Sequence, residues 1–266
     1  MLQLRMGENT VRFYKRVGGT YTQLGSDVAT TLNANTVYQL KVVVQGSTLT
    51  TYVDNVIKQS VSDSSHVRGR VGVRSYGSAA MFDNLAVNPL QLFTDDFEDG
   101  NSTGWVVLEG VATWSVVTDG ATKRYKNANA TAVSQIAAAG SAWSNFQAGV
   151  TIKCDTDQTG DYPGFLFRCT DVNNFYMLQL RMGENTARLY KRVGGTYTQL
   201  GSDSATSLSA GTAHRVEIEA IGTTIRTYVD GVLKHNLTDA TFSSGKIGVR
   251  SYEAPTAFDD LIVNAQ

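Results

Sequence analysis

The C-terminal third of the chain alternates most regularly between apolar and polar residues. Within residues 214–220, Val216, Ile218 and Ala220 occupy every second position, and charged residues lie between them. Successive side chains of a β-strand point to opposite faces, so this pattern predicts a strand with one face in the core and the other in water. Antiparallel sheets that are solvated on one side are built from such strands.

Similar alternation recurs in four earlier stretches, which are residues 144–154, 164–169, 174–182 and 187–193. Turn-forming pairs separate the strands. Gly194-Gly195 and Asp230-Gly231 are pairs that accept positive φ angles, as tight hairpins require. No window shows the 3.6-residue period of a helix. The sequence therefore predicts an all-β fold, an antiparallel two-sheet jelly-roll sandwich of about a dozen strands.

An internal repeat organises these strands. Residues 1–27 return almost unchanged at 177–203, and the match continues at an offset of 176 to the end of the chain. Residues 91–266 are therefore expected to form one complete β-sandwich repeat, and residues 1–90 correspond to the C-terminal half of another copy. Met1 takes the place that Met177 has inside a strand, so Met1 need not be a natural start, and the missing signal peptide says nothing about secretion.

The two copies leave one half-repeat without a partner. The half 91–176 is expected to pair with its neighbour 177–266. Residues 1–90 would then fold as a reduced sandwich, pair with another copy of themselves, or have lost a partner by truncation. Open strand edges and an exposed apolar face favour association. The sequence therefore predicts self-association, as a dimer or larger assembly, through residues 1–90.

Composition narrows the classes of partner. The formal net charge is −1, and the sequence contains no run of Lys and Arg, which argues against nucleic acid as a partner. No apolar segment approaches the roughly 20 residues that cross a bilayer, so membrane insertion is not expected. Abundant Gly and Tyr with only 3 Pro are typical of a sheet protein with tight turns.

The two cysteines are expected to be free thiols. Cys154 and Cys169 lie in strands 144–154 and 164–169, which are expected to form a hairpin around the loop 155–163. In symmetric pairing the two residues are staggered along the strands by roughly 16 Å, which is too far for a disulfide. Neither cysteine has a nearby histidine in the sequence, so a catalytic cysteine is not expected.

Motifs spread over the complete repeat resemble a known family. FTDDFEDG opens the repeat, GFLFR and NFYMLQL lie in its middle, and YVDG, GKIGVRSY and FDDLIV close it. In this order they resemble the concanavalin A-like, laminin-G-like jelly rolls, whose bacterial relatives occur as carbohydrate-binding modules and adhesion repeats. The resemblance implies a non-catalytic module that binds glycans on a concave sheet or at loop ends, often with a structural calcium ion.

Candidate glycan-binding residues are polar and aromatic side chains expected on the sheet face opposite the core. Gln179 and Arg181 alternate with the apolar Leu178 and Leu180, and Arg168 leaves the apolar side of the neighbouring strand. Arginine and amide groups match sugar hydroxyls and carboxylates, and a tyrosine ring can stack on a sugar. The predicted glycan-binding residues are Arg168, Gln179, Arg181, Tyr190 and Tyr252. The alternative is that such cross-strand pairs only stabilise an exposed sheet.

Acidic residues gather near both ends of the complete repeat. The first and last strands of such a sandwich are commonly neighbours, so these carboxylates are candidates for the oxygen-rich cage that Ca²⁺ prefers. The predicted metal ligands are Asp95, Asp96, Glu98, Asp99, Asp259 and Asp260. The alternative is that the acidic run is a solvated strand end and turn.

Enzymatic chemistry has little support in the sequence. His66, His214 and His235 form no cluster in the sequence, and Glu217 and Glu219 fit a solvated stripe rather than the two carboxylates of a glycosidase cleft. The sequence predicts a non-catalytic carbohydrate-binding or adhesion module from a tandem-repeat protein, extracellular or on the cell surface, whose partner is a polysaccharide or cell-surface glycan. The alternative is a structural repeat of a stalk or fibre that self-assembles. A glycan hydrolase or lyase is the least favoured class.

Overall fold

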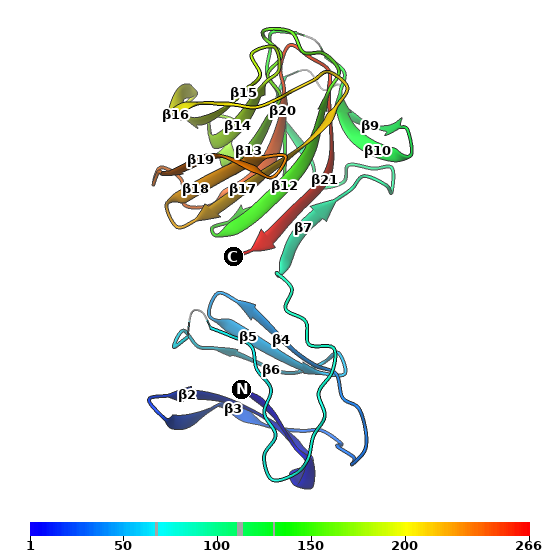
Figure 1. Cartoon of the computed structure of the whole chain (residues 1–266), viewed down its shortest axis with the longest axis vertical. Helices are drawn as coiled ribbons and strands as arrows, with labels where there is room; N and C mark the ends of the chain where they lie inside the picture. The colour runs from blue at the N-terminus through cyan, green and yellow to red at the C-terminus, as the bar shows by residue number, and fades with distance from the viewer. Residues whose placement is uncertain (67–68, 111–113, 130) are drawn as a thin grey trace. The chain divides into compact units, whose positions relative to one another are not determined.

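The strands of the chain fall into two separate groups. The computed structural model describes all residues except 67–68, 111–113 and 130. Its backbone divides into two units, Met1–Leu90 and Gln91–Gln266, which are described separately (Figure 1). Apart from the short 3-10 helix η1 (Met6–Glu8), the regular structure of the described residues consists of strands. Within the same residues, no helix is long and apolar enough to cross a membrane.

The second unit is a sandwich of two antiparallel sheets. The strands of one sheet are β7 (Gln91–Asp95), β9 (Trp114–Asp119), β10 (Thr122–Asn127), β12 (Phe146–Cys154), β17 (Ala213–Ile221), β18 (Thr224–Val229), β19 (Val232–Thr238) and β21 (Thr256–Ala265). The strands of the other are β8 (Val106–Glu109), β11 (Gln135–Trp143), β13 (Gly164–Asp171), β14 (Asn174–Arg181), β15 (Thr186–Val193), β16 (Thr196–Ala205) and β20 (Gly245–Ser251).

The order of the strands mixes distant parts of the chain. In the described residues the eight-stranded sheet runs β19-β18-β17-β12-β21-β10-β9, with β7 also paired to β21. The seven-stranded sheet runs β16-β15-β14-β13-β20-β11-β8. This arrangement confirms the predicted all-β, two-sheet jelly roll, with more strands than the dozen expected for the repeat.

The core of the second unit lies between its two sheets. Val216 and Ile218 on β17 are fully buried, and the charged residues between them face outward, as the alternation predicted. Leu178 and Leu180 contribute to the same core from β14 in the other sheet. Side chains at the intervening positions of β14 therefore point away from the core. This alternation determines which residues form the outer face of the seven-stranded sheet.

The predicted hairpin between residues 144–154 and 164–169 is wrong. Strand β12 pairs with β17 and β21 in one sheet, whereas β13 pairs with β14 and β20 in the other. The loop 155–163 therefore connects the two sheets. Cys154 and Cys169 are nevertheless free and buried, and this burial raises the pKa of both thiols to about 11.

Arg168 does not lie on the outer face, so its assignment as a glycan-binding residue is wrong. It is 1% exposed and has a φ of 46°, at a point where the register of β13 against its neighbours shifts. Its guanidinium donates to the carbonyl oxygens of Ser144 at 2.7 Å, Gly222 at 2.8 Å and Phe242 at 3.0 Å. The irregular backbone directs the side chain to these three carbonyls, and Arg168 joins three loops.

The first unit consists of two three-stranded sheets. One is ordered β1 (Leu2–Arg5), β2 (Thr10–Val17), β3 (Thr20–Ala29), and the other β4 (Leu40–Gln45), β5 (Thr48–Val53), β6 (Val56–Ser62). Its buried apolar side chains include Val11, Phe13 and Val53. Residues 69–90 form no regular strand. This unit therefore has much less core than its complete counterpart.

Candidate functional site

A row of polar side chains crosses the outer face of the seven-stranded sheet. Gln179 on β14 lies in register with Arg188 on β15 and with Gly164 on β13, and Gly164 lies in register with Arg250 on β20. The residues next to them along each strand belong to the core, so these side chains lie on the opposite face of the sheet, where Gln179 and Arg250 are only 4% and 6% exposed. A Cβ atom on Gly164 would lie 2.7 Å from the sulfur of Met177, which occupies the space beside it.

Three side chains at the end of this row form one hydrogen-bonded group. Arg181 donates to Glu184 Oε1 at 2.6 Å, and the Tyr162 hydroxyl donates to the same oxygen at 2.7 Å. The Arg181 guanidinium carbon also lies 4.5 Å from the centre of the Tyr162 ring. Burial raises the pKa of Tyr162, and its hydrogen bond to Glu184 acts in the same direction, so the hydroxyl keeps its proton at neutral pH.

An aromatic pair continues this group. The rings of Tyr162 and Tyr252 are stacked, with their centroids 6.0 Å apart and their planes inclined by 6°. Arg250 lies 4.4 Å from the centre of the Tyr252 ring, and its Nε donates to Ser134 Oγ at 2.9 Å. Each of the two rings thus contacts the other ring and an arginine, so aromatic and charged groups lie side by side, a combination that ligand sites use. We call Tyr162, Arg181, Glu184, Arg250 and Tyr252 the outer-face cluster.

Close backbone packing holds the loop of Tyr162 against the turn of Glu184. A Cβ atom on Gly183 would lie 2.3 Å from the backbone nitrogen of Thr159, so only glycine fits between these segments. The Tyr162 amide also donates to the carbonyl oxygen of Tyr252 at 3.1 Å. The cluster is therefore positioned by main-chain contacts as well as by side chains.

Several polar atoms near the cluster lack a hydrogen-bond partner among the residues that the structure describes. They are shielded from water, and each such atom costs about 1–3 kcal/mol unless a partner is supplied. The atoms are Gln179 Oε1, Arg181 Nε, Glu184 Oε2 and Thr186 Oγ1. Arg181 and Thr186 lie side by side in register on β14 and β15, so these polar atoms are gathered in one part of the sheet.

Tyr190 belongs to a neighbouring part of the same face. Its hydroxyl accepts a hydrogen bond from Arg188 at 3.0 Å, and Arg188 also forms a two-bond ion pair with Asp203 at 2.5 Å. The Tyr190 and Tyr197 rings meet edge to face at 5.7 Å. The Arg188 guanidinium is thus bonded to side chains of β15 and β16, whereas Arg181 Nε has no hydrogen-bond partner among the described residues.

The structure brings four of the five predicted glycan-binding residues to one face. Gln179, Arg181, Tyr190 and Tyr252 lie on or beside the outer face of the seven-stranded sheet, and Arg168 does not. Tyr162 and Glu184 were missed by sequence reasoning. Glu184 follows Arg181 by three residues, and the same spacing recurs as Arg5 and Glu8 in the first copy. This repeated spacing could have identified the ion pair of Arg181 and Glu184.

The same residue types recur in the first unit. At the offset of 176, the counterparts are Gln3, Arg5, Glu8, Arg12, Tyr14, Arg74 and Tyr76. Arg5 pairs with Glu8, and Arg12 donates to the Tyr14 hydroxyl at 2.8 Å, as their counterparts do. Tyr162 comes from the other half of a repeat and has no counterpart in residues 1–90. The first unit therefore contains part of the cluster only.

The predicted metal ligands lie near the paired strands β7 and β21 but turn to different partners. Asp95 accepts from Trp105 Nε1 at 2.8 Å, and Asp99 accepts from Asn101 at 2.6 Å. Asp96 and Asp260 line an open groove on the eight-stranded sheet. Burial raises the pKa of Asp95.

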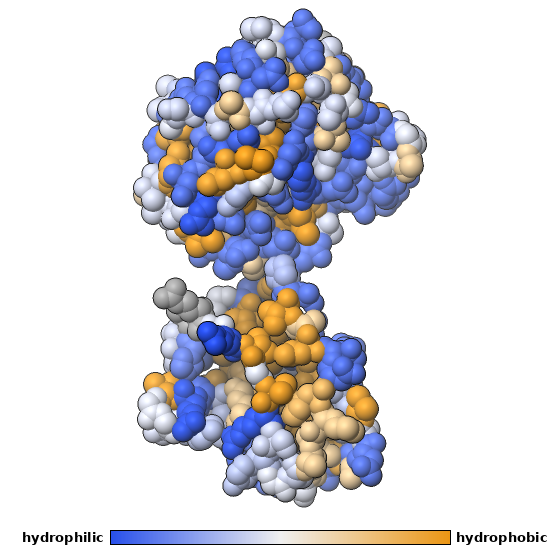
Figure 2. Space-filling model, viewed as in Figure 1, coloured by the Kyte–Doolittle hydropathy of each residue, from blue (hydrophilic) through white to orange (hydrophobic). Residues whose placement is uncertain are grey.

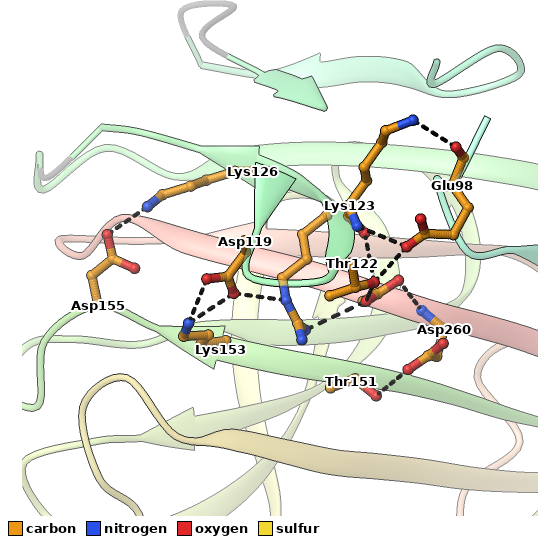
Figure 3. Close-up of polar contacts among 11 residues, drawn as sticks. Glu98, Asp119, Thr122, Lys123, Lys126, Thr151, Lys153, Asp155 and Asp260 are labelled. Carbon is orange, nitrogen blue, oxygen red and sulfur yellow. Dashed lines mark hydrogen bonds and ion pairs between the residues drawn. The ribbon is translucent and has the colours of Figure 1, made fainter. Parts of the chain in front are cut away.

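Other acidic side chains form ion pairs and hydrogen bonds around β10 (Figure 3). Glu98 accepts from Thr122 Oγ1 at 2.5 Å, and Asp259 accepts from the same hydroxyl at 3.0 Å. Asp260 accepts from Thr151 at 3.3 Å. In the described part of the chain, no three His, Cys, Asp or Glu side chains come together to hold a metal ion. The geometry does not fit the predicted calcium cage of six or more oxygens, and calcium binding itself stays a prediction.

A family comparison places the second unit among carbohydrate-related domains. The model of the 3-keto-alpha-glucoside-1,2-lyase-like domain matches residues 92–264, which is more than half of the chain. The chain belongs to this family. A levanase from Bacillus sp. (strain L7) is 24% identical over 99% of the chain, and the chain spans only 27% of that enzyme's length.

Two solved structures have folds similar to that of the second unit. The carbohydrate-binding module CBM66 from Bacillus subtilis has a TM-score of 0.51 and 18% identity, covering 62% of this chain and 98% of the module. The beta-glucanase from Bacillus licheniformis has a TM-score of 0.50 and 14% identity, covering 66% of this chain and 98% of the enzyme. At such low identity these structures show the fold alone, and that fold is the concanavalin A-like jelly roll.

The prediction that the chain is not an enzyme is wrong. It is overturned by membership of a family described as lyase-like. Tyr162, Glu184 and Tyr252 come from three distant segments, and only the folded sheet brings them together.

Proposed function

We propose that the second unit binds a polysaccharide at the outer-face cluster and serves a glycan-active enzyme. The observation that carries this proposal is the group formed by Tyr162, Arg181 and Glu184 beside the stacked ring of Tyr252. It combines an aromatic edge with a charged donor and a charged acceptor. Sugars are recognised by this combination, since they present apolar ring faces and hydroxyl groups together.

The unused hydrogen-bonding capacity supports the same site. Glu184 Oε2 and Arg181 Nε have no partner within the described residues, although both belong to a charged pair. Sugar hydroxyls donate and accept, so a bound sugar could satisfy both atoms after a small displacement of the side chains that cover them. The similarity to a carbohydrate-binding module and to a levanase agrees with a polysaccharide as the ligand.

Cleavage of the bound glycan at the same cluster is the second candidate function. Family membership favours it, because the family is described as lyase-like. In an elimination, Glu184 Oε2 would take a proton from the sugar carbon next to the scissile C–O bond. The C–O bond would break as a C=C bond forms, and Tyr162 would give its hydroxyl proton to the leaving oxygen. The 2.7 Å hydrogen bond between them holds the donor and the acceptor in one group.

The test measures binding and turnover with the full chain. Soluble polysaccharides are titrated into the protein by calorimetry, beginning with levan, and the mixtures are assayed for released sugars. Glu184→Gln keeps the shape of the side chain and removes its charge. Loss of a charge-assisted hydrogen bond of about 1.5–3 kcal/mol predicts affinity weakened roughly 10- to 100-fold. Tyr252→Ala should weaken binding because it removes the aromatic edge.

Glu217→Gln is the matched control, because Glu217 lies on the outward side of β17 in the other sheet. Its affinity should stay within about twofold of the original protein. Tyr162→Phe separates the two functions: lost turnover with retained binding would support cleavage at the cluster. Unchanged affinity in both Glu184→Gln and Tyr252→Ala would refute the proposed site.

A further inference from the structure

An irregularity in β21 shapes the outer face of the eight-stranded sheet. Strand β21 pairs with β10 through residues 256–258 and with β7 through residues 261–264, so its neighbour on this side changes between the two stretches. On its other side, two residues of β21, Asp260 and Leu261, lie against the single residue Val150 of β12. This two-against-one count is a β-bulge, and bulges redirect side chains and interrupt pairing.

The bulge places two consecutive carboxylates on the outer face. Phe258 and Leu261 both belong to the core between the sheets, so Asp259 and Asp260 between them both point away from it. Asp260 has a φ of 50°, and its counterpart Asn84 in the first unit has a φ of 52°. Asp and Asn tolerate this left-handed conformation better than most residues. Both copies therefore carry a residue that fits the bulge.

A groove of about 440 Å³ lies on the outer side of the bulge. Its volume is within the range of small-ligand sites, which is about 300–1,000 Å³. Its side chains come from β12, β17, β21 and the end of β7, and they combine hydroxyl, carboxylate, guanidinium and aliphatic groups. These residues are Thr94, Asp96, Thr151, Arg215, Asp260 and Ile262.

Arg215 brings unused hydrogen-bond donors to this groove. Its Nη1 donates to the carbonyl oxygen of Asp260 at 2.8 Å, and the guanidinium forms no ion pair among the described residues. A Cβ atom on Gly149 would lie 2.3 Å from Arg215 Nη2, so the guanidinium occupies the space beside this glycine. A guanidinium carries five N–H donors. Donors of Arg215 therefore remain available to a ligand in the groove.

Other charged side chains on this face are already paired. Lys153 donates to the two carboxylate oxygens of Asp119 at 2.8 and 2.7 Å, and Lys126 donates to Asp155 at 2.6 Å (Figure 3). Figure 2 shows a mostly hydrophilic surface on the second unit, with hydrophobic residues in separate patches. The unpaired guanidinium of Arg215 distinguishes the groove from the polar surface around it.

We propose that this groove is a second saccharide-binding site, which takes a neutral sugar with free hydroxyl groups. Arg215 donates to sugar oxygens, Asp96 and Asp260 accept from sugar hydroxyls, and Ile262 contacts the apolar part of the ring. The two carboxylates outnumber the guanidinium, so an anionic sugar fits the groove less well. The groove lies on the sheet opposite to the outer-face cluster, and the proposal does not depend on binding at that cluster.

The experiment follows the backbone amide signals of the isotope-labelled full chain by NMR during titration with short levan oligosaccharides, which are neutral. The amides of Thr151, Arg215 and Asp260 should shift together with a single affinity. Signals near Tyr162 and Glu184 report separately on the outer-face cluster, so failure at one site is distinguishable from failure at the other. A chelator should leave the affinity of the groove unchanged, because the proposed contacts need no metal ion.

Two variants remove the proposed contacts and preserve the backbone. Arg215→Met keeps the aliphatic stem and removes the donors, so the affinity of the groove should fall at least about 10-fold. Asp260→Asn keeps a residue type that accepts the positive φ, as Asn84 does, and should weaken binding about 3- to 10-fold because the acceptor loses its charge. Arg226→Met is the matched control, because Arg226 lies on β18 of the same sheet and is paired with Glu219 at 3.0 Å. Its affinity should stay within about twofold of the original protein.

Four results would overturn the proposal. The first is the absence of shifts at the groove amides during the titration. The second is unchanged affinity of the groove in either Arg215→Met or Asp260→Asn. The third is equal weakening by Arg226→Met, which would indicate a general effect of charge. The fourth is loss of binding in the chelator, which would assign the groove to a metal ion.

Discussion

Replacing Arg168 tests whether this side chain holds three loops together. Arg168→Ala removes the donor from the carbonyl oxygens of Ser144, Gly222 and Phe242. Hydrogen bonds to a charged group are worth about 1.5–3 kcal/mol each, and the cost of burying the guanidinium offsets part of their sum. We expect a net loss of about 3–5 kcal/mol in the free energy of unfolding, the range for breaking a buried charged network.

Thermal unfolding followed by tryptophan fluorescence measures this loss. The tryptophans are Trp105, Trp114 and Trp143, so the signal reports on the second unit. For a domain of this size, 1 kcal/mol shifts the midpoint by roughly 2–4 °C, so we expect a decrease of about 10 °C. Arg168→Lys should be intermediate, because one ammonium group cannot span three carbonyls.

Arg226→Ala is the control for removal of an arginine. The Arg226 side chain is 41% exposed and pairs with Glu219 at 3.0 Å. An exposed pair contributes less than about 1 kcal/mol, so its midpoint should change by only a few degrees. A midpoint for Arg168→Ala within about 2 °C of the original protein would refute the structural role. Weaker polysaccharide binding with unchanged stability would restore Arg168 as a ligand residue.

Two further predictions concern titration. The Asp239 carboxylate accepts hydrogen bonds from the Tyr176 hydroxyl at 2.6 Å and from Lys191 at 2.7 Å. Burial raises the pKa of Asp239, but these donors outweigh burial, so its pKa in the folded protein is lowered. The ionised carboxylate therefore stabilises the fold above about pH 4, and this stabilisation is lost as the pH falls. In an acid titration of unfolding, Asp239→Asn should lose less stability than the original protein. Cys154 and Cys169, with pKa values raised to about 11, should not react with a thiol reagent at neutral pH until denaturant is added; rapid labelling of the native protein would contradict their burial.

Local alternation accounts for what the sequence predicted well. The side of β14 that carries Gln179 and Arg181 follows from the apolar residues between them, because strand geometry fixes the faces within a few residues. The pairing of β7 with β21 was also expected, from the fold family. The sequence did not show that the carboxylates near these strands accept hydrogen bonds from protein donors, as Asp95 does from Trp105 and as Glu98 and Asp259 do from Thr122.

Long-range contacts account for what the sequence did not predict. Arg168 left the expected face because a register shift and a positive φ turned its side chain toward carbonyls from distant loops. Strands β12 and β13 were expected to pair because they are consecutive. Instead, β12 pairs with β17 and β13 pairs with β20, which both lie far along the chain. Tyr162 and Glu184 meet through the packing of two loops, and no sequence motif marks that contact.

The partial cluster in the first unit has a consequence for valency. Gln3, Arg5, Glu8 and Arg74 repeat the residue types of the site, but no residue of 1–90 takes the place of Tyr162. Both halves of a repeat are therefore needed to form one cluster. Two complete repeats linked in one chain would give two sites, and two linked sites on one polysaccharide give an avidity that can exceed either single affinity by roughly 10²–10⁴-fold.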